Sequence, residues 1–298
     1  TEVTLRLTIA AAAGSSAARL RDSDALACMF GNSGAWVRAT LVDAELMELR
    51  CAAPPAPQGA VGAVAVVVTV NGVQSSGATF AYRWAPTIGW IAPVAGAIAG
   101  GTVVTVHGQN FANDSTLACV FGERASAAAT FVASTRVTCV APFAGLAAAQ
   151  AGGASVALRV TNNGVDFSTV AEGVAGRASA ATFVYYAQPF VLSIAPKSGP
   201  LVGGTGVAIV GANFRNTAGL VCRFGGSSGT LVDAVWASAT LISCATPAQA
   251  VGGVVAVEVS NNAHDFAVAG STFRYVAAPV ASSITPASGP SEGGTAIA

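Results

Sequence analysis

The feature that most constrains this chain is an internal repeat. The segment PFVLSIAPKSGPLVGGTGVAIVGANF, residues 189–214, recurs as PTIGWIAPVAGAIAGGTVVTVHGQNF at residues 86–111, and a shorter copy, PVASSITPASGPSEGGTAIA, ends the chain. Similar segments at a regular spacing indicate several copies of one small structural unit, each with its own core, in place of one large core.

The repeated segment has the pattern of strands joined by a tight turn. Phe190, Leu192 and Ile194 alternate with smaller residues, which indicates a short strand, and Pro196 ends its ladder because proline has no N–H to donate. Gly203-Gly204 fits a turn, and the apolar run after it fits a buried strand. The chain is therefore predicted to be all-β.

Three motifs recur in the same order: I-x-P-x-x-G-x-x-x-G-G-T, then G-x-N-F, then C-x-F-G. This pattern resembles the IPT/TIG domain, the immunoglobulin-like module of plexin-type receptors, fibrocystin-like surface proteins, some transcription factors and some starch-acting enzymes. The resemblance extends over almost the whole chain and implies a tandem array of immunoglobulin-like β-sandwiches placed end to end. It identifies a module and not an activity, because one sandwich serves many functions.

The repeat spacing predicts four segments. Residues 1–84 form a first repeat that lacks its first strand, residues 85–187 a second repeat and residues 188–277 a third, and residues 278–298 form the first strand of a further repeat or a donor strand. We expect the tail of one copy to complete the first repeat of the next, by strand exchange between chains or by continuation of a longer chain. Continuation is the favoured version, because it needs no special mechanism.

Six cysteines fall at matched positions, two in each repeat. The second of each pair precedes a proline, and C-x-x-C knuckles of the kind that hold zinc do not occur. We therefore predict disulfides within each repeat and an oxidising, extracellular or cell-surface location. The predicted pairs are Cys28–Cys51, Cys119–Cys139 and Cys222–Cys244. Alternation in the strands between the cysteines predicts that Trp36, Phe131 and Trp236 lie on the core face.

The charge content is low and balanced, with 14 Lys and Arg against 14 Asp and Glu, so the chain lacks the basic footprint of a nucleic-acid binder. Three explanations fit a surface with so few charges. Sugars cover it, neighbouring subunits cover it, or the base composition of the genome favours Ala codons. Asn113 begins the N-glycosylation acceptor Asn-Asp-Ser, and further glycans are expected on Ser and Thr of residues 32–34, 74–77 and 227–230. The longest apolar stretch, residues 60–70, is too short for a membrane span.

No catalytic, cofactor or metal site is predicted. Gly289-Pro-Ser-Glu-Gly293 matches a nucleophile elbow, but the other copies have Leu201 and Ile98 in place of its serine. His107 and His264 lie in different repeats without ligand-like spacing. The oxygen-rich pairs Asp22/Asp24 and Asn113/Asp114 lack the surrounding multi-oxygen loop that calcium requires.

We accordingly expect an extracellular structural or adhesive glycoprotein, a rod or fibre of tandem TIG domains that associate or continue head to tail, with covalent glycans and further copies of itself as partners. The alternative is the ligand-binding ectodomain of a plexin-like or fibrocystin-like receptor. A third class, domains that flank an enzyme outside this chain, requires a catalytic domain elsewhere, and these residues themselves are not expected to form an enzyme.

Overall fold

The computed structural model describes residues 2–6, 25–32, 35–43, 48–56, 61–125, 129–145, 153–170, 182–267, 270–277 and 282–297. These residues form β-strands and one short 3-10 helix, η2 (Gly226–Ser228), so the fold is all-β. Contacts group the chain into two compact units, one of residues 1–91, 105–139 and 157–181 and the other of residues 92–104, 140–156 and 182–298.

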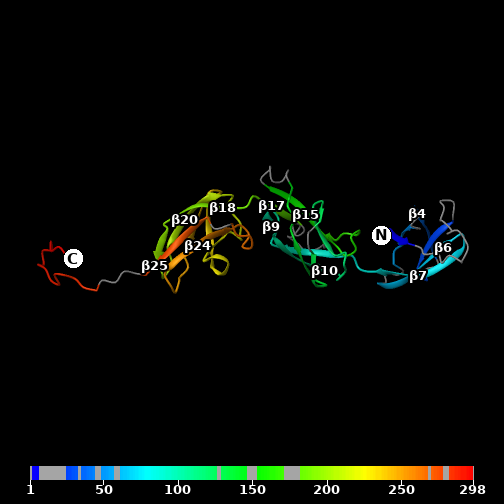
Figure 1. The fold of residues 1–298 in the computed structure, drawn as a ribbon, viewed down its shortest axis with the longest axis horizontal. Helices are drawn as coiled ribbons and strands as arrows, with labels where there is room; N and C mark the ends of the chain where they lie inside the picture. The colour runs from blue at the N-terminus through cyan, green and yellow to red at the C-terminus, as the bar shows by residue number, and fades with distance from the viewer. Residues whose placement is uncertain are drawn as a thin grey trace, which may run out of the picture. The chain divides into compact units, whose positions relative to one another are not determined.

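The third repeat is a two-layered sandwich (Figure 1). Its strand β22 takes part in both layers. The first half of β22 pairs with β21, and its second half pairs with β23 in the other layer. The layers enclose a core that includes Val207, Ile209, Phe224 and Phe273, none of them accessible to solvent. The strands are β18 (Phe190–Ala195), β19 (Ser198–Pro200), β20 (Gly206–Ala212), β21 (Val221–Phe224), β22 (Thr230–Ser238), β23 (Leu241–Ala245), β24 (Gly253–Ser260) and β25 (Ser271–Val276).

The second repeat has the same plan, with two five-stranded sheets in the orders β13-β14-β10-β8-β16 and β12-β11-β15-β17-β9. The short strand β9 pairs in parallel with β17, as β19 does with β25 in the third repeat. The strands are β8 (Thr87–Ala92), β9 (Ala95–Ala97), β10 (Val103–Gln109), β11 (Ala118–Phe121), β12 (Arg124–Ala125), β13 (Ala129–Ala133), β14 (Arg136–Val140), β15 (Gly153–Thr161), β16 (Thr169–Val170) and β17 (Thr182–Tyr186).

The first repeat forms a three-stranded sheet, β1-β5-β4, and a four-stranded sheet, β3-β2-β6-β7. Its core includes Leu26, Phe30, Leu49 and Val66. The strands are β1 (Glu2–Arg6), β2 (Leu26–Phe30), β3 (Trp36–Arg38), β4 (Thr40–Asp43), β5 (Glu48–Ala52), β6 (Gly62–Val70) and β7 (Val73–Tyr82).

Strand β1 has the register of β20, the strand that follows the opening turn of the third repeat. Val3 lies opposite Cys51 in β5, just as Val207 lies opposite Cys244 in β23. In the third repeat β20 also pairs with β18 on its other side. Among the described residues β1 pairs with β5 alone and therefore forms the edge of its sheet.

The asparagine of the G-x-N-F motif has a specific structural role. Asn213 adopts a left-handed backbone with φ 63°, a conformation that asparagine tolerates better than most residues. Its side-chain amide donates to the carbonyl of Gln188, where the chain enters the repeat. Asn110 does the same with φ 64° and the carbonyl of Ala85. The motif thus holds the end of β10 or β20 against the entry segment of its own repeat.

Strand β18 forms as predicted, but the side chains that face the core are not the alternating set Phe190, Leu192 and Ile194. Val191 and Ile194 are buried, whereas Phe190 and Leu192 are exposed. The register against β20 shifts between Val191 and Ser193. This bulge changes the inward face in the middle of the strand, and a strict period of two cannot predict it.

The prediction that Trp36, Phe131 and Trp236 lie on the core face is wrong for Trp36. Trp36 pairs with Met29 and is 41% exposed, and Leu41 occupies the place opposite Leu49. Trp236 lies opposite the buried Ile242 but remains 39% exposed. The second half of β22 has a partner on one side only, so a large ring at this edge is only partly covered.

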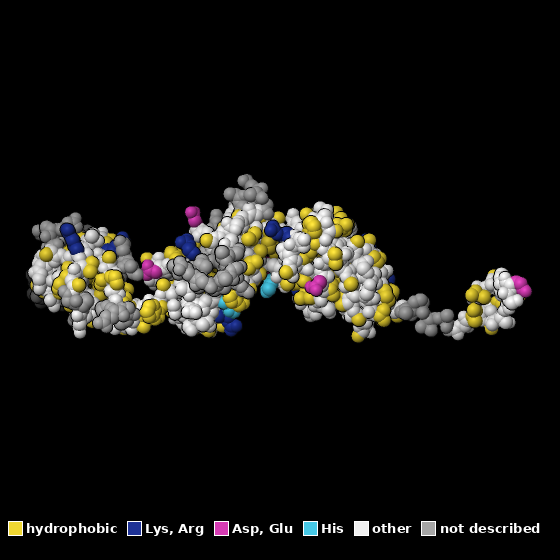
Figure 2. Space-filling view, turned by 180° about the vertical axis from the view of Figure 1, so that it is seen from behind, with side chains coloured by type: hydrophobic (Ala, Val, Ile, Leu, Met, Phe, Trp, Pro, Cys, Tyr) yellow, Lys and Arg dark blue, Asp and Glu magenta, His cyan; other side chains and the backbone are white. Residues whose placement is uncertain are grey.

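Phe131 has the register position of Trp236, opposite the buried Val137, and is itself half-buried. In the tail, residues 282–297 are exposed and form no strand. The predicted opening strand of the tail is therefore not formed in its described part, and its residues 278–281 lie outside the described residues. Figure 2 shows a face on which charged side chains are sparse, in keeping with the 9% of charged residues.

Candidate functional site: an edge pocket beside the first repeat

The structure joins the six cysteines in the three predicted pairs, Cys28–Cys51, Cys119–Cys139 and Cys222–Cys244. In the third repeat the bond connects β21 to β23, and thus one layer of the sandwich to the other. All six cysteines are buried. Asn113, the predicted glycosylation acceptor, is exposed in the loop after Phe111. This is the accessibility that glycosylation requires.

The two histidines lie in separate surroundings. His107 stacks on Trp90 with ring centroids 3.7 Å apart, and burial followed by the charge of Arg136 lowers the pKa of its imidazole. His264 Nδ1 lies 2.7 Å from the carbonyl oxygen of Asn262. Within the described part of the chain, no three His, Cys, Asp or Glu side chains gather as metal ligands. Asp22 and Asp24 lie outside the described residues.

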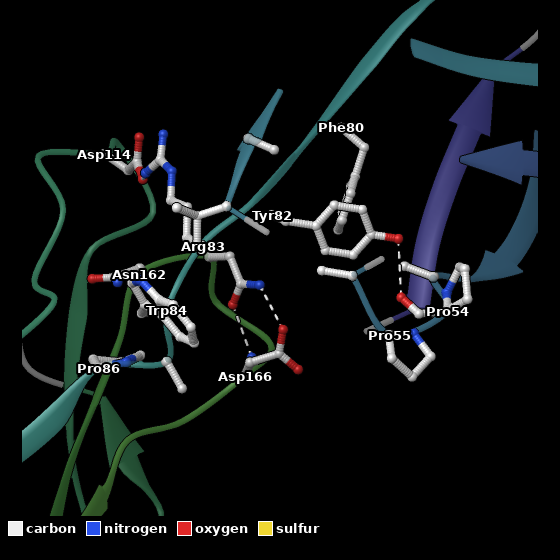
Figure 3. Close-up of a pocket in the computed structure, with 16 residues that line it drawn as sticks. Pro54, Pro55, Phe80, Tyr82, Arg83, Trp84, Pro86, Asp114, Asn162 and Asp166 are labelled. Atoms are coloured by element: carbon white, nitrogen blue, oxygen red, sulfur yellow. Dashed lines mark hydrogen bonds and ion pairs between the residues drawn. The ribbon is translucent and has the colours of Figure 1, made fainter. Parts of the chain in front are cut away.

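A cavity of about 680 Å³ opens beside the first repeat, within one of the two compact units (Figure 3). We call it the edge pocket. Residues 53–56 and 80–86 of the first repeat and its linker line one side, together with Val61. The other side belongs to the second repeat and consists of Asp114, Asn162, Asn163 and Asp166.

The first-repeat side of the pocket is a row of aromatic rings at the end of β7. Phe80 and Tyr82 meet edge to face with centroids 5.0 Å apart, and the Tyr82 hydroxyl donates to the carbonyl of Pro54 at 2.9 Å (Figure 3). Trp84 follows in the linker and is 60% exposed. Arg83 forms an ion pair with Asp114 across the rim.

The same row of rings occurs in the other repeats, where it is covered. Phe273 and Tyr275 have the same edge-to-face packing at 5.0 Å, and the Tyr275 hydroxyl donates to Pro247 as Tyr82 does to Pro54. Phe273 is 0% and Tyr275 2% exposed, whereas Phe80 and Tyr82 are both partly exposed.

The cover in those repeats is the turn that follows the opening strand. Strand β19 pairs with the end of β25, and β9 pairs with the end of β17. In sequence, these turns immediately precede Thr205 and Thr102, the residues that correspond to Thr1. The edge pocket is therefore the position that residues 95–101 and 198–204 fill in the second and third repeats.

The second-repeat side is formed by a loop that the third repeat also contains. Asn163 Oδ1 accepts the N–H of Asp166 at 2.8 Å, and its Nδ2 donates to the Asp166 carboxylate. Asn262 and Asp265 have the same two contacts. In addition, Asn262 Nδ2 donates to the carbonyl of Ala95 at 2.9 Å and Thr102 Oγ1 to Asp265 at 2.6 Å. The loop of one repeat thus binds the opening turn of the repeat before it.

Reasoning from sequence missed this loop as a contact site. A pair of asparagines ends the long strand in both repeats, at residues 162–163 and 261–262. In both copies an aspartate follows three residues after the second asparagine. That shared spacing was the available signal. The spacing indicates that the two loops share a turn geometry, but it does not reveal which residue of the preceding repeat the loop contacts.

The fold and the site together define a tandem immunoglobulin-like module protein in which the second and third sandwiches are each closed by their own opening turn. The model of the IPT/TIG domain matches residues 86–185 and 189–275, well over half of the chain. The chain belongs to the IPT/TIG domain family.

Several solved structures are similar to this chain, with low sequence identity and low TM-scores. The extracellular region of plexin A4, domains 1 to 10, is 16% identical over 96% of this chain and 28% of its own length, with a TM-score of 0.40. A plexin A4 structure of domains 1 to 8 is 15% identical over 93% of this chain and 32% of that chain, at 0.36. The Bacteroides ovatus glucan-utilization protein SGBP-B, in complex with a mixed-linkage heptasaccharide, is 13% identical over 93% of this chain and 70% of that chain, at 0.23.

This chain spans about a third or less of the length of the two plexin structures. TM-scores this low carry no information about function. No helix among the described residues is long and apolar enough to cross a membrane.

Proposed function

We propose that this protein is an extracellular structural or adhesive glycoprotein, part of a rod or fibre in which TIG repeats associate or continue head to tail. The observation that carries the proposal is the edge pocket. Within the described residues, the first repeat has one uncovered edge at β1 and another at the end of β7, and the opening segment of a repeat supplies both covers elsewhere in the chain.

The opening segment of a repeat occurs once more, in the tail. Residues 279–294 repeat the sequence pattern of residues 189–204. Because the pocket and the tail are different surfaces, their contact is heterologous and propagates instead of closing as a dimer. Repetition of such a contact generates a linear assembly.

The disulfides and the surface support an extracellular location. Disulfides form and persist in oxidising compartments, and each repeat has one between its core strands. An exposed acceptor asparagine at Asn113 and a surface with few charges fit covalent glycans. In this proposal sugars supply the surface polarity that the side chains lack.

The test is the assembly state of the protein. Sedimentation velocity over a range of concentrations, with negative-stain electron microscopy, should show linear oligomers of the 298-residue chain or filaments in native material. The matched comparison is the same chain without residues 279–298, which should remain monomeric. A 298-residue chain that is monomeric at every concentration, together with isolated rods in native material, would instead support the receptor-ectodomain alternative.

A further inference from the structure

The linker between the second and third repeats is short and is bonded to both of them. The carbonyl of Tyr186, at the end of β17, accepts the N–H of Ile98 at 2.9 Å within the second repeat. The carbonyl of Gln188 accepts the side-chain amide of Asn213 at 3.0 Å within the third repeat. Only Ala187 lies between these two bonded residues. The linker therefore gives the two repeats little freedom to move apart.

A polar contact joins the two repeats beside this linker. The carboxylate of Asp265, in the third repeat, accepts the hydroxyl of Thr102, in the second, at 2.6 Å. It also accepts Nδ2 of Asn262 at 2.8 Å, and the same nitrogen donates to the carbonyl of Ala95 at 2.9 Å. Thr102 is 0% exposed. A hydrogen bond to a charged acceptor is stronger in a site sheltered from water, so this contact helps to hold the repeats together.

The ring of Tyr186 adds an aromatic contact at the same junction. It is 2% exposed, and the guanidinium of Arg215, in the third repeat, lies 5.7 Å from its centroid. Burial, and then the charge of Asp265, raise the pKa of the Tyr186 hydroxyl, an effect that the charge of Arg215 opposes. The phenol is therefore neutral, and separation of the repeats would remove its contact with Arg215.

The part of the second repeat that the third repeat contacts is its opening turn. Within this turn β9 pairs with the end of β17 over three residue pairs. Asn262 bonds to Ala95, the first residue of β9, and Asp265 bonds to Thr102, just before β10. The third repeat therefore holds both ends of the turn that closes the second sandwich.

We propose that this junction makes the second and third repeats one cooperative unit, in which the third repeat stabilises the opening turn of the second. The inference concerns contacts within one chain, so it goes beyond the head-to-tail assembly proposed above and holds whether or not chains associate. In an array, the stability of each repeat is the sum of its own stability and its interfaces with its neighbours. The interface is lost when the first of the two repeats unfolds, so a change on one side of the junction destabilises the repeat on the other side.

The experiment follows the unfolding of each repeat separately in the full 298-residue chain. Trp90 lies in β8 of the second repeat and Trp236 in β22 of the third, and phenylalanine replaces the other three tryptophans in each of two reporter chains. Trp90 fluorescence in urea reports on Asp265→Ala, a change in the third repeat. Trp236 fluorescence reports on Thr102→Val, a change in the second.

The repeat that unfolds first should show the effect of the substitution in its neighbour. If the second repeat unfolds first, Asp265→Ala should lower the Trp90 midpoint by at least about 0.5 M urea. If the third unfolds first, Thr102→Val should lower the Trp236 midpoint by a similar amount. Asp265→Asn keeps the shape of the side chain and removes its charge, so it should act in the same direction, and it replaces the alanine variant if that variant does not fold.

Two matched controls carry the same kinds of substitution away from the junction. Asp233→Ala in β22 and Thr130→Val in β13 each change an exposed side chain. Each should leave the urea midpoint of the other repeat unchanged.

The outcomes decide whether the two repeats are coupled. A lower midpoint in the neighbouring repeat for a junction variant, without one for its control, supports the inference. If both Asp265→Ala and Thr102→Val leave the neighbouring repeat as its control does, the repeats unfold independently and the inference is wrong. Controls that lower the neighbouring midpoint as much as the junction variants would also overturn it. These readouts do not depend on self-association, so they test the inference separately from the proposed assembly.

Discussion

The buried amide of Asn261 offers the sharpest test of how the repeats hold their loops. Its Oδ1 accepts the N–H of Arg215 at 3.0 Å, and its Nδ2 donates to the carbonyl of Asn213 at 2.9 Å. The side chain is 2% exposed, so Asn261→Ala removes both bonds at a site that water reaches poorly. Asn162 makes the same pair of bonds in the second repeat, to Ala112 and Asn110.

The magnitude follows from the two lost bonds. A typical hydrogen bond contributes about 0.5–1.5 kcal/mol net, so the third repeat should lose about 1–3 kcal/mol of its free energy of unfolding. With a urea dependence of about 1.5 kcal/mol per molar, the unfolding midpoint should fall by about 0.7–2 M.

The assay needs a reporter confined to the third repeat. Trp236 is suitable, because its Nε1 donates to the carbonyl of Phe214 beside this loop. Phenylalanine in place of the other three tryptophans, Trp36, Trp84 and Trp90, leaves its fluorescence as the only tryptophan signal during urea unfolding. The matched control is Asn216→Ala, a change at an exposed position in the same loop, expected to stay within about 0.5 kcal/mol. An Asn261→Ala midpoint that matches this control would refute the role assigned to the amide.

Three further outcomes are expected. Replacing Cys222 and Cys244 by serine should destabilise the third repeat by about 3 kcal/mol, because their disulfide closes a loop with a sequence separation of 22. Urea unfolding measures this change. Peptide mapping of the unreduced wild type should show the pairing. Burial and the charge of Arg136 hold the pKa of His107 below 6.5. The stabilising contribution of the neutral imidazole is therefore present above that pH and is lost as pH falls through the lowered pKa. His107→Gln should flatten the pH dependence of the urea midpoint between about pH 7.5 and about pH 5. The 298-residue chain, produced in a secreting host that glycosylates proteins, should exceed its bare 29.2 kDa by intact mass. Asn113→Gln should remove one N-glycan from that excess, whereas an unmodified mass would contradict the glycan proposal.

The repeat, the all-β fold and the tight turns could be predicted from sequence because they depend on local backbone requirements. Gly203 and Gly204 both have positive φ, and so does the asparagine at position 213, which few other residues tolerate. Matched cysteines in successive copies led to the same pairs that the structure contains, since equivalent positions of a repeated unit occupy equivalent places in space.

Only the tertiary structure decided which apolar side chains lie inside and where a partner can bind. A bulge in β18 turns Val191 inward in place of Phe190 and Leu192, and an edge strand leaves Trp236 half in water. The edge pocket brings together Pro54, Phe80 and Asp166, which lie far apart in the sequence. Such a surface depends on strand register and on contacts across a junction, and local sequence determines neither, because both follow from how the completed sandwiches pack.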